Sequence, residues 1–185
     1  MRAETLRRVF LEQPAPKGLS ADGLRCAAAL VPIEPERGVW LTRRSADLPT
    51  HAGQVAFPGG KVDPSDASAE DTALREAQEE VGLNPHQVDI LGRLPDHTTV
   101  TGFHITPVVA LVPKAVELRP EMGEVAEIFA LPFSVLLNPD YPVRRQMVIS
   151  GWERAFWVWP HPDHVIWGAT AQILRNLALR LRAAR

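Results

Sequence analysis

The sequence predicts an α+β fold, a mixed α/β sandwich in which strands precede and follow one central helix. Apolar runs over residues 25–33 and 103–112 have the length of buried strands. Between them, residues 68–82 form a helical pattern with acidic residues in its first turn. A second amphipathic helix is expected over residues 166–182. Regular β-α-β alternation is missing, so a doubly wound fold is not favoured.

The other expected elements are short. Residues 3–12 should form an amphipathic helix that ends in the segment 13–18. Residues 38–43 are expected to pair with the first strand as a hairpin, and a turn is expected at Pro58-Gly59-Gly60 after the extended residues 55–57. Further strands are predicted at 88–95, 124–130, 143–150 and 154–159, the last two turning at Gly151, and a short helix at 134–137.

Composition limits the class of protein. The 185 residues, 45% of them hydrophobic, suffice for a single domain over 1–185, with an N-terminal helix and connector at 1–20 and a C-terminal helix at 166–185. A formal net charge of −2 gives no footprint for nucleic-acid binding. The single Cys26 excludes a disulfide framework and is expected to be a buried apolar residue. No membrane-spanning run or signal-peptide pattern is present, which predicts a cytoplasmic protein.

Three carboxylates on the central helix carry most of the functional information. Glu76 and Glu80 lie four residues apart and therefore share one helix face, with Glu79 beside them. Like charges at this spacing repel each other. A divalent cation would offset the repulsion, and Mg²⁺ is usually held by a few carboxylates, waters and phosphates. The alternative is an ordinary solvated acidic face.

Glycines precede this helix. Gly59 and Gly60 would allow positive φ angles and a close approach of the backbone to a metal or phosphate. An ordinary turn is the alternative, because Pro-Gly-Gly is turn-prone. A phosphate-binding P-loop is not supported, because Val55 stands where its first glycine is required and no Ser or Thr follows Lys61.

The run from Arg75 to Leu83, with Gly60 upstream, resembles the Nudix box of the Nudix hydrolases. The resemblance implies a Nudix-like α/β/α sandwich with a mixed central sheet, and Mg²⁺- or Mn²⁺-dependent hydrolysis of a nucleoside diphosphate linked to another group. The interval from Gly60 to Arg75 is one residue longer than in the standard box. Asp66 or Asp63 stands near the place of the box's first Glu.

Two further segments resemble the coenzyme A pyrophosphatases within this family. They are residues 41–60, from Leu41-Thr42-Arg43-Arg44-Ser45 to Phe57-Pro58-Gly59-Gly60, and residues 166–171; Pro49 replaces one arginine of the first signature. The resemblance implies cleavage of coenzyme A to adenosine 3′,5′-bisphosphate and 4′-phosphopantetheine. Another substrate, such as ADP-ribose or a dinucleotide, is the alternative. A non-catalytic binding module is the third hypothesis.

The resemblance also assigns roles to residues. Glu76 and Glu80 would hold the metal, and Glu79 would be a third ligand or a catalytic bridging group. Arg75, four residues before Glu79, would orient these carboxylates. An acid from a later loop would act as the general base, and Glu124 matches the family position better than the other two candidates. The candidates are Glu121, Glu124 and Glu127.

Substrate contacts are expected from the loop at 44–53 and from residues 93–104. The substrate-binding candidates are Arg43, Arg44, Arg93, Gly59 and Gly60, with the arginines pairing with phosphates. Histidines 97 and 104 either line the pocket or are structural, and the pair His161 and His164 favours a turn over a metal site. The expected partner is a small nucleotide substrate, with no nucleic acid or membrane, and the oligomeric state stays open.

Overall fold

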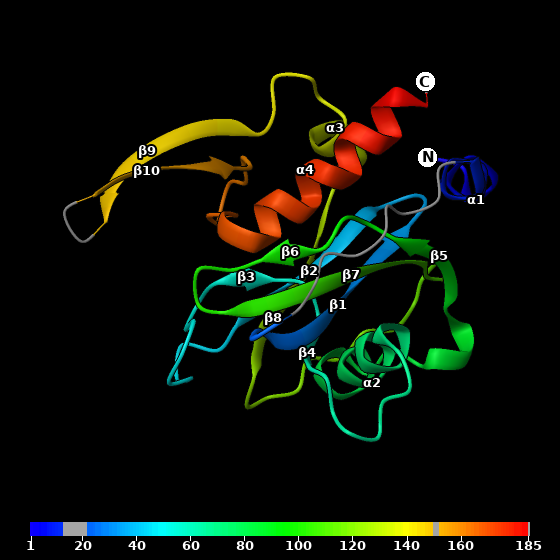
Figure 1. The fold of residues 1–185 in the computed structure, drawn as a ribbon. Helices are drawn as coiled ribbons and strands as arrows, with labels where there is room; N and C mark the ends of the chain where they lie inside the picture. Colours follow the sequence, from blue (N-terminus) through cyan, green and yellow to red (C-terminus); the bar gives the residue numbers. More distant parts are fainter. Residues whose placement is uncertain (13–21, 150–151, 185) are drawn as a thin grey trace.

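The computed structural model of the chain describes residues 1–12, 22–149 and 152–184 (Figure 1). In this part of the chain, eight strands form one sheet and two more form a separate hairpin. The strands of the sheet are β1 (Arg25–Glu34), β2 (Gly38–Arg44), β3 (Val55–Ala56), β4 (Gly59–Lys61), β5 (Asp89–Arg93), β6 (His97–Thr98), β7 (Phe103–Leu111) and β8 (Val125–Leu131). The hairpin consists of β9 (Val143–Ile149) and β10 (Trp152–Val158). The helices are α1 (Ala3–Glu12), α2 (Ala69–Val81), the 3₁₀ helix η1 (Pro85–Gln87), α3 (Phe133–Leu136) and α4 (Gly168–Ala183).

The sheet is mixed, as expected. Its main path is β3-β2-β1-β7-β5, and β4, β6 and β8 pair with β1, β7 and β2 respectively. The long central strands β1 and β7 run parallel, with Arg25 beside Phe103 at one end and Ile33 beside Leu111 at the other. The other pairs in the sheet are antiparallel.

Helices cover both faces of the sheet, with α2 below it and α4 above it in Figure 1. Small and branched side chains join α2 to the sheet: Ala28, Leu30, Ala73, Ala77, Val81 and Val108. Larger side chains fill the other layer, among them Leu6, Phe10, Val31, Trp159, Leu174 and Leu177. Burying each large apolar side chain contributes about 1.5–3 kcal/mol. The two layers confirm the α/β/α sandwich.

Both ends of α2 lie where the sequence predicts them. The Ser68 hydroxyl accepts a hydrogen bond from the Asp71 N–H at 3.1 Å, which caps the first turn. Such a cap contributes about 1 kcal/mol. Gly82 ends the helix with φ of 66°, a left-handed conformation that glycine adopts without strain. These two caps fix which turns of the helix carry the acidic residues.

The predicted turn at residues 58–60 is wrong, because Gly59–Lys61 forms strand β4 against β1. Neither Gly59 nor Gly60 has a positive φ, so the expected conformational role is also wrong. The glycines are required by close packing instead. A Cβ on Gly59 would lie 2.4 Å from the carbonyl oxygen of Ala28.

Other outcomes concern single segments. Cys26 is exposed rather than buried, because burial along β1 begins only at Ala28. The short elements η1 and β6 were not predicted. The expected connector at 13–18 and the turn at Gly151 lie outside the described residues. Within the described ranges, no helix combines the length and apolar character needed to cross a membrane.

Candidate metal centre

Two carboxylates of α2 turn toward the sheet. Glu80 is only 5% exposed, and its Oε2 accepts the N–H of Gly59 at 3.3 Å. Its other oxygen lies 3.9 Å from Nη1 of Arg44, at the end of β2. Glu76, one turn earlier, is partly buried, whereas 61% of the Glu79 side chain is exposed. The predicted shared face of Glu76 and Glu80 is confirmed, and Glu79 lies at its solvent edge.

The carboxylate of Glu76 lies directly against the backbone of Gly60. A Cβ at position 60 would be 2.5 Å from both carboxylate oxygens of Glu76. Any side chain there would push the carboxylate away, although Glu76 is flexible enough to move. Gly60 therefore leaves room for Glu76, whereas Gly59 leaves room for the backbone of β1.

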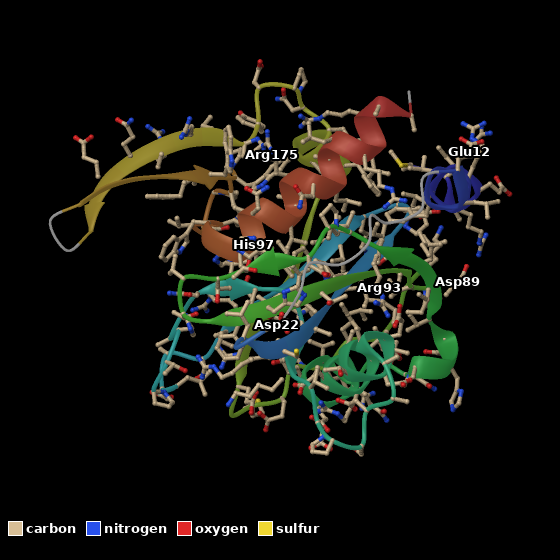
Figure 2. All side chains as sticks on the ribbon, in the orientation of Figure 1. Glu12, Asp22, Asp89, Arg93, His97 and Arg175 are labelled. Carbon is tan, nitrogen blue, oxygen red and sulfur yellow. The ribbon has the colours of Figure 1, made fainter. Side chains whose placement is uncertain are left out.

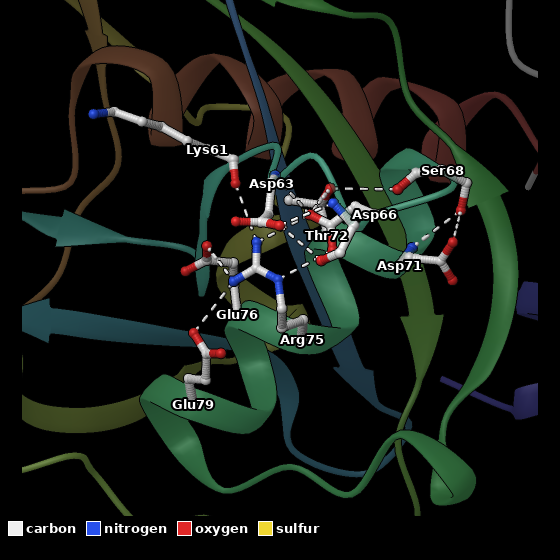
Figure 3. A network of polar contacts seen from close by, with 10 residues as sticks. Lys61, Asp63, Asp66, Ser68, Asp71, Thr72, Arg75, Glu76 and Glu79 are labelled. Carbon is white, nitrogen blue, oxygen red and sulfur yellow. Dashed lines mark hydrogen bonds and ion pairs between the residues drawn. The ribbon is translucent and has the colours of Figure 1, made fainter.

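Arg75 joins the acidic residues into one network (Figure 3). Its Nε and Nη2 donate to the two carboxylate oxygens of Asp66 at 3.1 and 3.0 Å. Its Nη1 donates to Glu76 at 2.8 Å and to Glu79 at 3.3 Å. A further bond from Nη2 reaches the carbonyl oxygen of Lys61 at 3.1 Å. The predicted pairing of Arg75 with Glu79 is confirmed, within a larger set of contacts.

Asp66 takes the position that the sequence left open between Asp66 and Asp63. Its side chain is 5% exposed and also accepts the hydroxyl hydrogen of Thr72 at 2.8 Å. The hydrogen bonds from Arg75 hold the pKa of Asp66 far below its usual value, and in return raise the pKa of Arg75. Asp63 binds Ser65 at the surface instead.

Burial and mutual repulsion disfavour the charged forms of the inner carboxylates. Burial is the main reason that the pKa of Glu80 is raised from 4.5 to about 7. Burial also raises the pKa of Glu76, and the negative charge of Glu124 acts in the same direction on both residues. Three carboxylates from α2 and from the segment before β8 therefore repel one another across a small space.

This donor set fits a hard divalent cation. Oxygen ligands suit Mg²⁺ and Mn²⁺, and a bound cation would relieve the repulsion among Glu76, Glu80 and Glu124. Across the described ranges, no three His, Cys, Asp or Glu side chains already surround a common point as metal ligands would. Arg75 donates to one carboxylate oxygen of Glu76 and to one of Glu79, which fixes the orientation of both groups.

The three later acids that the sequence offered as candidate bases have different surroundings. Glu124 is exposed and is the one whose charge reaches Glu76 and Glu80. The carboxylate of Glu121 accepts backbone N–H groups of its own loop. Glu127 pairs with Nε of Arg43 at 3.2 Å and with Nε2 of His164 at 3.3 Å. The geometry thus favours Glu124 among the three.

The three candidate substrate-binding arginines also have different surroundings. Arg43 and Arg44 are consecutive in β2, where neighbouring side chains point to opposite faces, and a register shift lies between them. Arg44 reaches Glu80, whereas Arg43 is paired with Glu127. Arg93, the last residue of β5 and labelled in Figure 2, forms two short bonds with Glu70 at 2.7 and 2.6 Å. Only Arg44 of these three contacts the carboxylate cluster.

The histidines belong to structural clusters. His161 and His164 stack with ring centroids 4.6 Å apart, and both contact the ring of Phe129, which the sequence did not single out. His104 is buried and bonded to Asp96 at 3.1 Å. These contacts favour the structural alternative for His104, His161 and His164. Trp159, which is 1% exposed, is in the core as expected.

Comparison with known proteins gives the family. Residues 24–150 match the family model described as NUDIX domain. A Pectobacterium atrosepticum protein named "Uncharacterized Nudix hydrolase NudL" is 46% identical over 168 residues, and its Cronobacter sakazakii namesake is 44% identical over 159. Each match covers 85% of this chain and 83% of the relative. A solved Nudix hydrolase from M. smegmatis, RenU, is 26% identical, with a TM-score of 0.46 over 60% of this chain and 71% of that chain. The chain belongs to the Nudix family and is a Nudix hydrolase, a pyrophosphohydrolase acting on a diphosphate substrate.

Proposed function

We propose that this Nudix hydrolase cleaves the diphosphate bond of coenzyme A, with residues 1–185 acting as one domain. One observation carries the proposal: the segment that resembles the coenzyme A signature touches the acidic cluster. Arg44 lies 3.9 Å from Glu80, and the Gly59 N–H donates to the same carboxylate. The signature and the Nudix box therefore contribute to one site.

Glu76 and Glu80 are proposed to hold a Mg²⁺ or Mn²⁺ ion, with Glu79 as a third ligand. The bound ion would neutralise phosphate charge and lower the pKa of a coordinated water. Arg75 binds both Glu76 and Glu79, and it is itself fixed by Asp66. Its proposed role is to hold these carboxylates in the orientation that ligation requires.

Glu124 is proposed as the general base. It takes a proton from the attacking water, the water oxygen bonds to one phosphorus, and the bond from that phosphorus to the bridging oxygen breaks. The leaving phosphate keeps the electron pair of that bond. Arg44 is proposed to bind the diphosphate, since its Nε has no hydrogen-bond partner among the described residues and guanidinium groups pair well with phosphate. Arg43, already paired with Glu127, is a weaker candidate.

A second candidate substrate is another nucleoside diphosphate derivative, such as ADP-ribose or a dinucleotide. It is favoured by Pro49, an exposed residue in the place of an arginine of the coenzyme A signature. Losing one cationic side chain removes one contact available to an anionic substrate, so preference for coenzyme A rests on the remaining positions.

The test is product analysis. The protein is incubated with coenzyme A, ADP-ribose or a diadenosine polyphosphate, with Mg²⁺ or Mn²⁺, and the products are separated by chromatography. We expect adenosine 3′,5′-bisphosphate and 4′-phosphopantetheine from coenzyme A. Glu124→Gln should lower kcat by about 100-fold or more, whereas Glu127→Gln should not. Intact coenzyme A beside cleaved ADP-ribose would overturn the substrate assignment, and full activity of Glu124→Gln would overturn the base.

A further inference from the structure

The loop before β8 is fastened by a carboxylate that lies outside the acidic cluster. Oε2 of Glu121 accepts the backbone N–H of Gly123 and the backbone N–H of Glu124, both at 2.8 Å. The Glu124 N–H also reaches the carbonyl oxygen of Glu121, at the longer distance of 3.2 Å. The carboxylate of Glu121 thus closes a tight turn, together with backbone bonds from the N–H groups of Glu124 and Val125 to the Glu121 carbonyl oxygen. Bonds to an ionised acceptor are stronger than those between neutral groups.

The same residue ties this turn to the metal-binding helix. The backbone N–H of Glu121 donates to the carbonyl oxygen of Glu80 at 2.8 Å, and that of Arg119 donates to Val81 at 2.9 Å. These carbonyls belong to the last turn of α2, where no intrahelical donor is available. These two hydrogen bonds attach the loop to the last turn of α2, at the residue that carries the buried carboxylate of Glu80.

The far side of the turn is fixed from β2. The N–H of Ser45 donates to the carbonyl oxygen of Glu124 at 2.8 Å, and Ser45 follows Arg44 in the chain. Glu124 is thus held at its N–H by Glu121 and at its carbonyl by Ser45. Its side chain remains exposed and has no hydrogen bond to Glu121 or Ser45 that would restrict it. The position of the Glu124 carboxylate is therefore set by hydrogen bonds to the Glu124 backbone and not by bonds to its side chain.

We infer that Glu121 is a positioning residue, which places Glu124 against the cluster of Glu76 and Glu80 and acts on the reaction only through Glu124. The inference rests on the proposed function, because it assumes that Glu124 is the base. It gives Glu121, the candidate that matches the family position less well, a role distinct from that of Glu124. Glu121 does not touch the substrate, and its charge serves the turn.

The reason for a kinetic effect is geometric. Without the carboxylate of Glu121, the Gly123 N–H loses its acceptor, and the turn keeps only the bonds from the N–H groups of Glu124 and Val125 to the carbonyl oxygen of Glu121, at 3.2 and 2.9 Å. The turn can then open, and the carboxylate of Glu124 drifts from the attacking water. A displacement of about 1 Å at a reacting group can lower the rate by about 100-fold. Substrate binding, which depends on other residues, should change little.

The test compares five variants in steady-state hydrolysis of the substrate that the product analysis identifies, with Mg²⁺ or Mn²⁺. Glu121→Ala should lower kcat by about 10- to 100-fold and change KM by less than about threefold. Glu121→Gln keeps an acceptor oxygen in place, so we expect it to retain most of the rate. Glu117→Ala is the matched control, since Glu117 lies on the same loop, is 83% exposed and pairs only with Arg119 among the described contacts. Thermal unfolding is measured for each variant.

The decisive comparison is the double variant. Because Glu121 acts through Glu124, adding Glu121→Ala to Glu124→Gln should lower kcat by less than about twofold further. If Glu124→Gln alone keeps full kcat, the proposed base is wrong and the inference falls with it. If Glu124→Gln is slow but Glu121→Ala is not, the inference alone is overturned. An equal loss in both backgrounds, or a Glu121→Gln variant as slow as Glu121→Ala, would also overturn it.

Discussion

Replacing Glu80 with glutamine should stabilise the metal-free protein at alkaline pH while removing activity. The Glu80 side chain is buried, and its pKa is raised from 4.5 to about 7, chiefly by burial. The difference between these two pKa values corresponds to about 3 kcal/mol, by which the free energy of unfolding falls when Glu80 ionises. Glutamine has the same shape, carries no charge, and can still accept the Gly59 N–H.

The direction of the pH dependence follows from the raised pKa. Between pH 4.5 and about 7, the folded protein holds the Glu80 proton more tightly than the unfolded chain does. The contribution of the protonated Glu80 carboxyl to the stability of the folded state is therefore complete below pH 4.5, and it is lost as the pH rises through about 7. Urea unfolding in the presence of a chelator should show similar stabilities for wild type and Glu80→Gln at pH 4.5. At pH 8 the variant should be more stable by about 3 kcal/mol.

The same unfolding measurements are made with added Mn²⁺ and with a control variant. Added Mn²⁺ should stabilise the wild type, because ligand binding favours the folded state, and should stabilise Glu80→Gln much less. Glu79→Gln is the control, since Glu79 is 61% exposed and should give little stabilisation at pH 8. Equal stability of wild type and Glu80→Gln at pH 8 would refute the reasoning. So would an equal response of both proteins to Mn²⁺.

Three further substitutions test the parts of the site. Asp66→Asn removes the charged partner of Arg75 and should weaken Mn²⁺ binding by about 10-fold or more in calorimetric titration. Asp63→Asn, at the surface, should leave the affinity unchanged. Equal affinities of the two variants would contradict this prediction. Gly60→Ala should keep the fold by circular dichroism yet weaken Mn²⁺ binding, because its methyl group displaces the facing carboxylate; unchanged binding would refute it. Arg44→Ala should raise KM for the diphosphate substrate by about 10-fold, and Arg43→Ala should raise it less. A larger effect at Arg43 would reverse the proposed assignment of the two arginines.

The parts of the site that depend on local chemistry could be predicted from the sequence. Ser68 and Gly82 are cap residues whose preference arises within one turn of the helix, so both ends of α2 were found. The common face of Glu76 and Glu80 follows from helical geometry alone. The pairing of Arg75 with Glu79 is likewise a matter of spacing four residues along one helix.

Contacts between distant segments could not be predicted in this way. Arg43 and Arg44 are neighbours in the sequence, yet Arg43 pairs with Glu127 and Arg44 lies beside Glu80. This difference depends on the pairing of β2 with β8 and on the register shift between the two arginines. The sequence predicted a turn at Gly59 and Gly60 from the local pattern alone. Their packing against Ala28 and Glu76 joins residues far apart in the chain and could not be predicted from that pattern. Cys26 lies in an apolar run, yet the core begins two residues later.

The buried carboxylate of Glu80 lies where two separate segments of the sequence meet. Glu80 is contacted by the Gly59 N–H, by Arg44 and, through its backbone carbonyl, by Glu121. Gly59 and Arg44 belong to the segment that resembles the coenzyme A signature, whereas Glu121 belongs to the loop of the candidate base. Ser45, next to Arg44, in turn holds that base loop. These three segments contact one another at less than 4 Å. We therefore expect a substitution among the proposed substrate-binding residues to alter the proposed metal ligands as well.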